Sequence, residues 1–412
     1  MREDGTFEPM NGPAGEVPSR RQFLEASLGG FAALLRAVDA ETASGVSGIA
    51  AALESCGPDP LAGGVRVETV PFSDAGSVRF GTLEGRGLDA RLLTDLSSLG
   101  PDTLVTPNNT FYVRTAYPDG LEPRDPWTIS IGGLVRRPVE VALPALVPQV
   151  SPRGLYVMEC AGNSLPGQFG LISAARWSGV PMADVLARVE PLPQATRVLV
   201  SGFDRHTHPS YTSSPGASWI FTFDDLRSSG AFLATEMNGQ PLPTDHGYPV
   251  RLYVPRWYGC ACIKWVNEIS LVDDDAPSTP QMREFGPRTF QNGRPALARE
   301  FKPAAMDVAA MPVRIEKWRL DGRVVYRVIG IIWGGSAVTD RLAIRFNSRE
   351  EFVPVNICPK ATTTDTWSLW SCVWRPTEAG RYRIVLRVMD PSVRTERLDS
   401  YYYTREVRIG EV

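Results

Sequence analysis

The sequence predicts an α+β chain: a domain of mixed strands and helices, followed by an all-β sandwich. Short strand-like runs mix with a few helical segments over residues 65–275, whereas residues 306–412 contain strand-like runs at close spacing. The chain also holds 37 glycines and 35 prolines, which mark frequent turns and favour strands. A length of 412 residues allows two or three domains of ordinary size.

Residues 1–45 are predicted to be a disordered start followed by an export leader. The part before Ser19 is polar and rich in Gly, Pro and Glu, a composition that predicts disorder. SRRQFL (19–24) and the run ASLGGFAALL resemble a twin-arginine leader, with a cleavage site after Ala40. The alternative is an amphipathic helix that is retained. We therefore expect a periplasmic protein, with a cytoplasmic one as the alternative.

The first domain is predicted to span residues 65–275. Residues 127–135, 155–158 and 196–203 are apolar runs that predict strands, while residues 182–189 follow Pro181 and predict a helix. Residues 276–305 are rich in proline and charge and show little periodicity, which predicts a connecting segment.

Residues 306–412 predict a β-sandwich of immunoglobulin type. Two alternating runs meet at Asp321-Gly322, a hairpin turn signal, and four more runs follow at short intervals. These strands carry many bulky residues, more than one small sandwich needs to bury, and so predict a homodimer interface; they include Trp367, Trp370 and Trp374.

Composition argues against several classes of function. A net charge of −3 and a pI of about 5.8 do not favour nucleic acid or an anionic membrane surface, and no apolar run is long enough to span a membrane. The three histidines disfavour a His-rich zinc or di-iron site, and no Cys-x-x-Cys-His motif for covalent haem occurs. Cys260 and Cys262 have the wrong spacing for a zinc knuckle, and Cys358 and Cys372 are candidates for a disulfide in an exported protein.

Three short islands place polar residues in apolar surroundings. TPNNTFYVRTAYP (106–118) holds Arg114, ECAGN (159–163) holds Cys160, and residues 236–265 hold His246, Arg251 and Lys264. A thiolate suits a soft or high-valent metal, and arginine suits phosphate. The alternatives are a buried apolar cysteine, a surface arginine and a plain turn at His246.

Taken together, the islands resemble the sulfite oxidase family of molybdenum-cofactor (molybdopterin) oxidoreductases, including the bacterial sulfite and sulfane dehydrogenases. The resemblance covers about residues 65–410 and rests on NGQPLPTDHGYPVRLYVP, WYGCACIKW and GLISAARWSGVPMADVL. It implies a molybdopterin-binding catalytic domain followed by an immunoglobulin-like dimerisation domain. It also implies that Cys160 is the thiolate ligand of one molybdenum per chain, and that Arg114 orients an anionic substrate.

The remaining site residues are likewise implied by the resemblance. They would line the substrate pocket or bind pterin and phosphate, and they are Tyr112, Val113, Arg114, Thr115, Asp204, His246, Arg251, Ile263 and Lys264.

Two departures from the family concern the substrate. Asn163 is followed by Ser-Leu-Pro where the family has arginines, and Phe285 takes the place of an active-site tyrosine. The pocket is therefore expected to keep Arg114, to lose cationic contacts and to handle sulfite poorly. In the alternative, Arg283 or Arg288 reaches in and restores the charge.

The function implied is transfer of an oxygen atom to or from a small sulfur compound such as sulfite. Electrons would pass to a separate carrier, cytochrome c-like or other, since no haem segment is recognised. The alternatives are a sulfane or thiol-conjugate dehydrogenase, an S-oxide reductase and, from another class, a non-catalytic cofactor-bound assembly protein.

Overall fold

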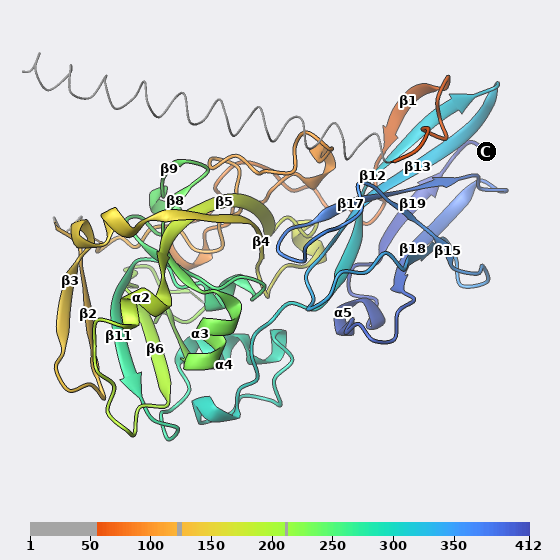
Figure 1. Ribbon diagram of the computed structural model, residues 1–412. Coiled ribbons are helices and arrows are strands. Elements are labelled where there is room, and N and C mark those ends of the chain that lie inside the picture. Colours follow the sequence, from red (N-terminus) through yellow and green to blue (C-terminus); the bar gives the residue numbers. More distant parts are fainter. Residues whose placement is uncertain (1–55, 122–125, 211–212) are drawn as a thin grey trace, which may run out of the picture. The chain divides into compact units, whose positions relative to one another are not determined.

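Most of the regular structure is strand, and the helices are few and short (Figure 1). The computed structural model describes residues 56–121, 126–210 and 213–412. The predicted leader, residues 1–45, lies outside the described residues.

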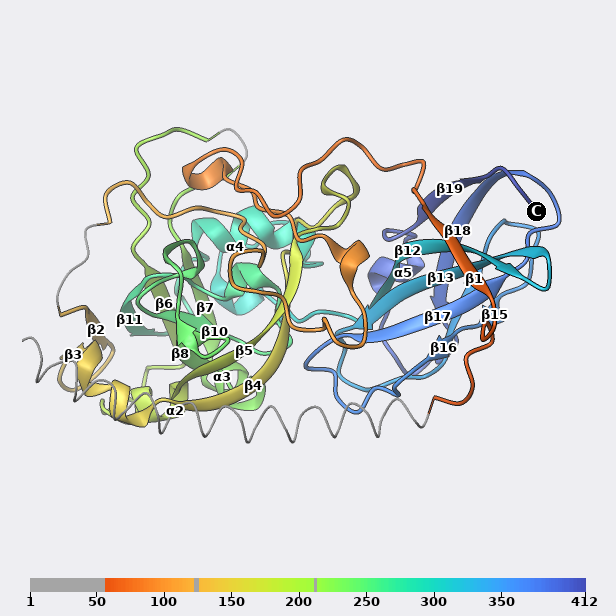
Figure 2. The same ribbon diagram turned by 90° about the horizontal axis from the view of Figure 1, so that it is seen from above.

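Two five-stranded sheets make up the first part of the described chain. One has the order β10 (Arg251–Tyr253), β8 (Phe232–Met237), β5 (Ile172–Pro181) and β4 (Ser151–Glu159), with β9 (Gln240–Pro241) paired to β8. The other has the order β3 (Val139–Ala142), β2 (Thr128–Gly133), β11 (Val266–Val272), β6 (Arg197–Gly202) and β7 (Ser218–Thr222). Figure 2 shows β4 and β5 as a long curved pair.

The elements predicted in this part are confirmed. The three strand-like runs form β2, β4 and β6, and the predicted helix is α2 (Met182–Leu186). α3 (Phe223–Ser229) begins at Thr222, whose side chain accepts from the Asp225 amide in a capping box, and it ends at Gly230 with φ of 70°. These caps fix the two ends of a helix that is only two turns long.

The segment predicted to be a plain connection contains a helix, α4 (Pro280–Phe285). Thr279 caps its start by accepting a hydrogen bond from the Met282 amide, and Pro280 occupies its first position, where no amide hydrogen is needed. The sequence pattern missed α4 because six residues are too few to show helical periodicity. α4 matters because it helps to line the candidate site.

Two antiparallel sheets make up the C-terminal part. One has the order β1 (Val65–Val70), β12 (Ala309–Leu320), β13 (Arg323–Trp333), β17 (Ser368–Trp374) and β16 (Asn356–Ile357). The other has the order β15 (Val353–Pro354), β14 (Leu342–Arg345), β18 (Gly380–Val388) and β19 (Arg405–Ile409), and α5 (Glu396–Asp399) precedes β19. β1 pairs with β12, so a strand from the start of the predicted catalytic domain completes this sheet.

The predicted hairpin is confirmed as β12 and β13. Asp321 and Gly322 both have positive φ, 49° and 75°, as a two-residue turn between twisted strands requires. The two C-terminal sheets face each other through Trp374 of β17, whose ring stacks on Phe346 at 4.1 Å and meets Tyr382 of β18 at 4.8 Å. The assignment of these sheets as immunoglobulin-like stays a prediction.

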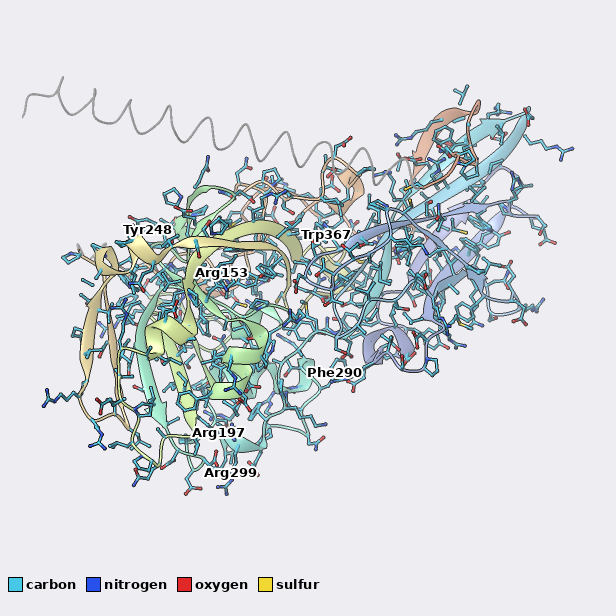
Figure 3. The ribbon with its side chains drawn as sticks, viewed as in Figure 1. Arg153, Arg197, Tyr248, Phe290, Arg299 and Trp367 are labelled. Carbon is cyan, nitrogen blue, oxygen red and sulfur yellow. The ribbon has the colours of Figure 1, made fainter. Side chains whose placement is uncertain are left out.

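The tryptophans that suggested a dimer interface lie in the core of this chain. Trp367 and Trp370 are each 1% exposed and Trp374 is 7% exposed. Trp367, labelled in Figure 3, donates from Nε1 to Leu104 O at 2.9 Å, so it joins two distant segments of one chain. The argument from these residues to a homodimer is therefore wrong, because packing within the chain already covers them.

The predicted disulfide between Cys358 and Cys372 is also wrong. Cys358 is disulfide-bonded, as is Cys56, but Cys372 is a free and buried thiol. Within the described part of the chain, none of the helices is long and apolar enough to cross a membrane.

Gly330 provides a test of the C-terminal packing. A Cβ at this position would lie 2.1 Å from Trp370 Cζ2 and 2.3 Å from Met311 O. We expect Gly330→Ala to lower the free energy of unfolding by about 1–3 kcal/mol, as overpacking does, measured by denaturant unfolding of the purified protein. Gly380→Ala is the control, since no atom lies within 4 Å of its Cβ. Equal losses in both variants would contradict the packing described here.

Candidate functional site

One cavity brings together all ten residues predicted for the site. They come from three distant stretches of sequence and from the end of β6, and they are Tyr112, Val113, Arg114, Thr115, Cys160, Asp204, His246, Arg251, Ile263 and Lys264. α4 adds Gln281, Glu284 and Phe285 to the lining. The geometry thus groups the predicted residues, while their roles in binding stay predictions.

Cys160 sits directly after β4, in a tight loop that aims its sulfur into the cavity. Its amide bonds to Leu171 O at 2.9 Å, and its carbonyl accepts from the Asn163 amide at 2.9 Å. The Gly162 amide donates to Cys160 Sγ at 3.3 Å. The thiol is 3% exposed, and these bonds hold it in one orientation.

Arg251 braces the loops on the other side of the cavity. Its Nη1 donates to His246 O and its Nη2 to Cys262 O, each at 3.0 Å, whereas its buried Nε has no hydrogen-bond partner. Gly247, which follows His246, has φ of 109°. A Cβ on Gly247 would lie 3.0 Å from Arg251 Cβ and 3.2 Å from Lys264 Cβ. Only glycine allows this turn and this close approach together.

His246 is neutral in this cavity. Burial lowers its pKa to about 3, and the nearby charges of Lys264 and Arg251 act in the same direction. Its Nε2 lies 3.1 Å from Asn108 O, a carbonyl that can only accept, so Nε2 carries the proton. Nδ1 is then an acceptor for a donor group of a ligand.

Lys264 is a buried cation held by carbonyl groups. Its Nζ donates to Thr115 O and, at 2.8 Å, to Asp245 O. Its pKa is lowered to about 7, chiefly by burial and also by the charge of Arg251, while Asp245 opposes the shift. A bound anion would stabilise the charged ammonium of Lys264 and so raise its pKa.

Arg114 reaches the cavity from the first island. Its Nη1 donates to Leu88 O at 3.0 Å and its Nη2 to Ser213 Oγ at 2.6 Å. Glu284 Oε1 lies 3.9 Å from Nη2, so one carboxylate partly balances this guanidinium.

Arg288, one of the two arginines considered as a replacement for the lost cationic contacts, lies beside the Cys160 loop. A Cβ placed on Gly162 would lie 3.3 Å from Arg288 Nη1 and 3.7 Å from Cys160 Sγ, so Arg288 does approach the thiol. Arg283 donates to Ser278 O and is not among the residues that line the cavity.

Arg91, which the sequence reading missed, supports this cluster from behind. Its Nη1 donates to Arg114 O at 2.6 Å. The pKa of Arg91 is lowered to about 10, chiefly by burial and also by the charge of Arg114, while Cys160 opposes both effects. No motif in the sequence marks Arg91, since only the fold brings it to this place.

Asp204 lines the cavity with its carboxylate already engaged. Oδ2 accepts from the amides of Gly216 at 2.6 Å and Ala217 at 2.9 Å, and Oδ1 lies 2.6 Å from His206 Nε2. Burial opposes ionisation of Asp204, but His206 and the two amides lower its pKa on balance. Its contacts therefore organise the loop after β6.

The donors present fit a molybdenum cofactor with a phosphate group. A soft sulfur at Cys160 suits molybdenum, and Lys264 with the unpartnered Nε of Arg251 suits an anion in the same cavity. The neutral His246 offers an acceptor for a ring N–H. Among the described residues, no group of three or more His, Cys, Asp or Glu side chains could hold a metal ion.

Comparisons with known proteins agree with this chemistry. Residues 116–280 match the family described as oxidoreductase molybdopterin binding domain. The chain is 31% identical over 199 residues to mitochondrial sulfite oxidase of Macaca fascicularis, and 34% identical over 200 residues to the NADPH nitrate reductase of Aspergillus niger. These matches cover 45% and 44% of this chain, but only 36% and 22% of the two relatives. The chain therefore matches less than half the length of either relative.

A solved structure shares the fold. The sulfane dehydrogenase SoxCD of Paracoccus pantotrophus matches with a TM-score of 0.58 over 84% of this chain and 92% of that chain. The sequence identity is 18%, so this similarity concerns the fold alone.

Lys264 gives the site a predicted dependence on pH. Its folded-state pKa of about 7 lies below the ordinary 10.5, so the unfolded chain binds more protons between these values. The cofactor-free protein should therefore gain stability from this group as the pH rises through that window. The stabilisation that a bound dianion provides should fall as the pH rises, because the dianion pairs with the charged ammonium of Lys264. We expect sulfate to raise the melting temperature more at pH 6 than at pH 9.

Two variants check this assignment by thermal unfolding. Lys264→Met should remove the pH dependence of the sulfate effect, while Lys360→Met, an exposed lysine, should leave it unchanged. If Lys264→Met kept the full difference between the two pH values, the anion would bind elsewhere.

Proposed function

We propose that this chain, which belongs to the sulfite oxidase family of molybdopterin oxidoreductases, transfers an oxygen atom to or from a small sulfur compound such as sulfite. The observation that carries the proposal is the single cavity in which the Cys160 thiol, Arg114 and the buried cations meet. The 31% identity to a sulfite oxidase supports the sulfur substrate.

The residues of the cavity divide into two groups under this proposal. Cys160 would supply the protein's ligand to molybdenum, and Lys264, Arg251 and His246 would hold the pterin and its phosphate. When bound, the cofactor supplies a metal centre that exchanges an oxygen atom and two electrons with the substrate. The chain itself would position that centre in a cavity whose lining residues are mostly buried.

Arg114 and Arg288 would orient the anionic substrate beside Cys160. Arg114 lines the cavity and Arg288 approaches the Cys160 loop at Gly162, while Arg91 holds the Arg114 backbone. This cationic surrounding favours sulfite as a substrate, in contrast to the expectation from the sequence alone. Phe285 offers no hydroxyl, so the orientation of the anion would depend on the arginines.

A second candidate is reduction of nitrate. The observation that favours it is the 34% identity to a nitrate reductase over 200 residues. Both anions suit a pocket of arginines, so two assays are needed to separate the candidates. Sulfite oxidation is followed by the reduction of an oxidised dye, and nitrate reduction by the oxidation of a reduced dye.

Partners and location follow as further parts of the proposal. Electrons released from sulfite would pass to a separate carrier, which is tested by the reduction of added cytochrome c.

Export through the paired arginines is supported by the disulfide-bonded Cys358, since such bonds persist in oxidising compartments. Cell fractionation tests the location. A homodimer, suggested by the family resemblance, is tested by light scattering.

Cys160→Ser tests the assignment of the metal ligand. A hydroxyl is a harder and much less acidic ligand than a thiol, so turnover should fall by orders of magnitude while the cofactor is largely retained by the remaining contacts. The measurements are dye-linked activity and molybdenum content of the purified variant. Near-normal turnover would remove Cys160 from the proposed mechanism.

Arg288→Met tests the second cationic contact to the substrate. A charge-assisted hydrogen bond contributes about 1.5–3 kcal/mol, so KM for sulfite should rise about ten- to a hundredfold. Arg283→Met is the matched control, because Arg283 bonds to Ser278 and should leave KM nearly unchanged. Equal KM values in the two variants would exclude Arg288 from substrate binding.

A further inference from the structure

A buried carboxylate lies immediately before the candidate metal ligand. Glu159 ends β4 and is 0% exposed. Its Oε1 accepts hydrogen bonds from Arg397 Nη1 at 3.1 Å, from Asn163 Nδ2 at 3.2 Å and from the Tyr403 hydroxyl. Its Oε2 accepts from Trp333 Nε1 at 3.0 Å. Both carboxylate oxygens are therefore satisfied, as a buried charge requires.

Most of these donors come from the C-terminal part of the chain. Trp333 ends β13, Arg397 belongs to α5, and Tyr403 precedes β19. The Tyr402 hydroxyl also donates to Asn163 O, in the same loop as Cys160. The loop that presents the thiol is thus held by residues more than 150 positions away in the sequence.

Arg397 makes the decisive contacts. It is 3% exposed, and its second nitrogen, Nη2, donates to Ala161 O at 2.8 Å and to Arg288 O at 3.1 Å. One guanidinium therefore joins the residue before Cys160, the residue after it and the backbone of Arg288. Burial disfavours its charge, but Tyr403 and Glu159 more than offset this and raise the pKa of Arg397 above its ordinary value.

Aromatic rings hold the guanidinium in place. Its Cζ lies 4.5 Å from the Tyr258 ring centre and 5.0 Å from that of Tyr402. Phe290, labelled in Figure 3, follows at 6.0 Å. A side chain enclosed in this way and bonded by both nitrogens has little freedom to move.

We propose that Glu159 and Arg397 are a positioning pair, through which the C-terminal part sets the placement of the Cys160 sulfur relative to the Arg288 guanidinium. Neither side chain lines the cavity, so the pair acts through the Cys160 loop, whose thiol does line it, and through the backbone of Arg288 behind it. The inference rests on the proposed role of Cys160 as metal ligand and of Arg288 as substrate contact. Arg397 of α5 thereby affects the placement of the Cys160 sulfur, although α5 lies far from Cys160 in the sequence.

The test separates positioning from stability by removing one partner or both. Arg397→Met or Glu159→Gln alone disturbs a buried pair and should lower the melting temperature. The double variant Glu159→Gln/Arg397→Met removes both charges and should recover much of that loss. It cannot restore the bonds to Ala161 and Arg288, so the Cys160 loop should stay loose.

Two readouts report on the loop without relying on turnover. The first is the rate at which iodoacetamide alkylates Cys160 in cofactor-free protein, followed by mass spectrometry of the peptide. We expect a rate at least tenfold faster in the double variant than in the wild type. The second is the molybdenum–sulfur signal of the loaded protein in X-ray absorption, which should weaken or broaden. The conservative single variant Arg397→Lys should lie between the wild type and the double variant in both the alkylation rate and the X-ray absorption signal.

Kinetics and a matched control complete the design. The double variant should raise KM for sulfite and lower kcat, because both Arg288 and Cys160 shift. Arg405, which is buried, and Asp74, which is partly buried, form another ion pair, with Arg405 Nε 3.1 Å from Asp74 Oδ1. Asp74→Asn/Arg405→Met should change stability alone, with wild-type alkylation and X-ray absorption.

Wild-type alkylation of Cys160 and a wild-type X-ray absorption signal in the double variant would overturn the proposal and leave the pair a structural one. Failure of the proposed function is distinguished by Cys160→Ser: if its X-ray absorption signal matched that of the wild type, Cys160 would not be the metal ligand. The alkylation result would still report whether Arg397 orders the loop.

Discussion

The buried charge of Glu159 is the constraint on which the arrangement of the site depends. A carboxylate with no exposed surface must be neutralised and fully hydrogen-bonded, or the fold that buries it is strongly destabilised. The partners that satisfy it come from β13, α5 and the segment before β19. The loop that carries Cys160 is therefore held in part by residues of the C-terminal part of the chain.

The cavity itself holds several cations as well as the carboxylates of Asp204, Asp245 and Glu284. Lys264, Arg251 and Arg114 line it, and Arg288 and Arg91 lie close behind. Within the protein these groups are held mainly by backbone carbonyls, which carry only partial charges. Under the proposed function, a cofactor phosphate and an anionic substrate would pair with these cations.

Local patterns accounted for much of the fold. The alternation of apolar residues predicted β2, β4, β6 and the C-terminal strands, and Asp321-Gly322 predicted the hairpin turn between β12 and β13. Burial of the three tryptophans in their own chain was not predictable, because the same residues suit a core and an interface equally well. The helix α4 was missed since it is short and lies in a proline-rich stretch.

The sequence by itself determined the chemistry available to this protein: a cysteine after a buried strand, arginines and a lysine in apolar islands, and a likeness to a molybdopterin family. Those features involve residues that are neighbours in the chain, so they can be recognised from the sequence alone. The tertiary structure alone decided which side chains share the cavity with Cys160. It also decided which side chains lie behind that lining: Arg288, Arg91 and Arg397 belong to segments without a distinctive motif, and only the fold brings them near the Cys160 loop or Arg114. Contacts between residues so far apart in the chain are set by packing, which no local pattern encodes.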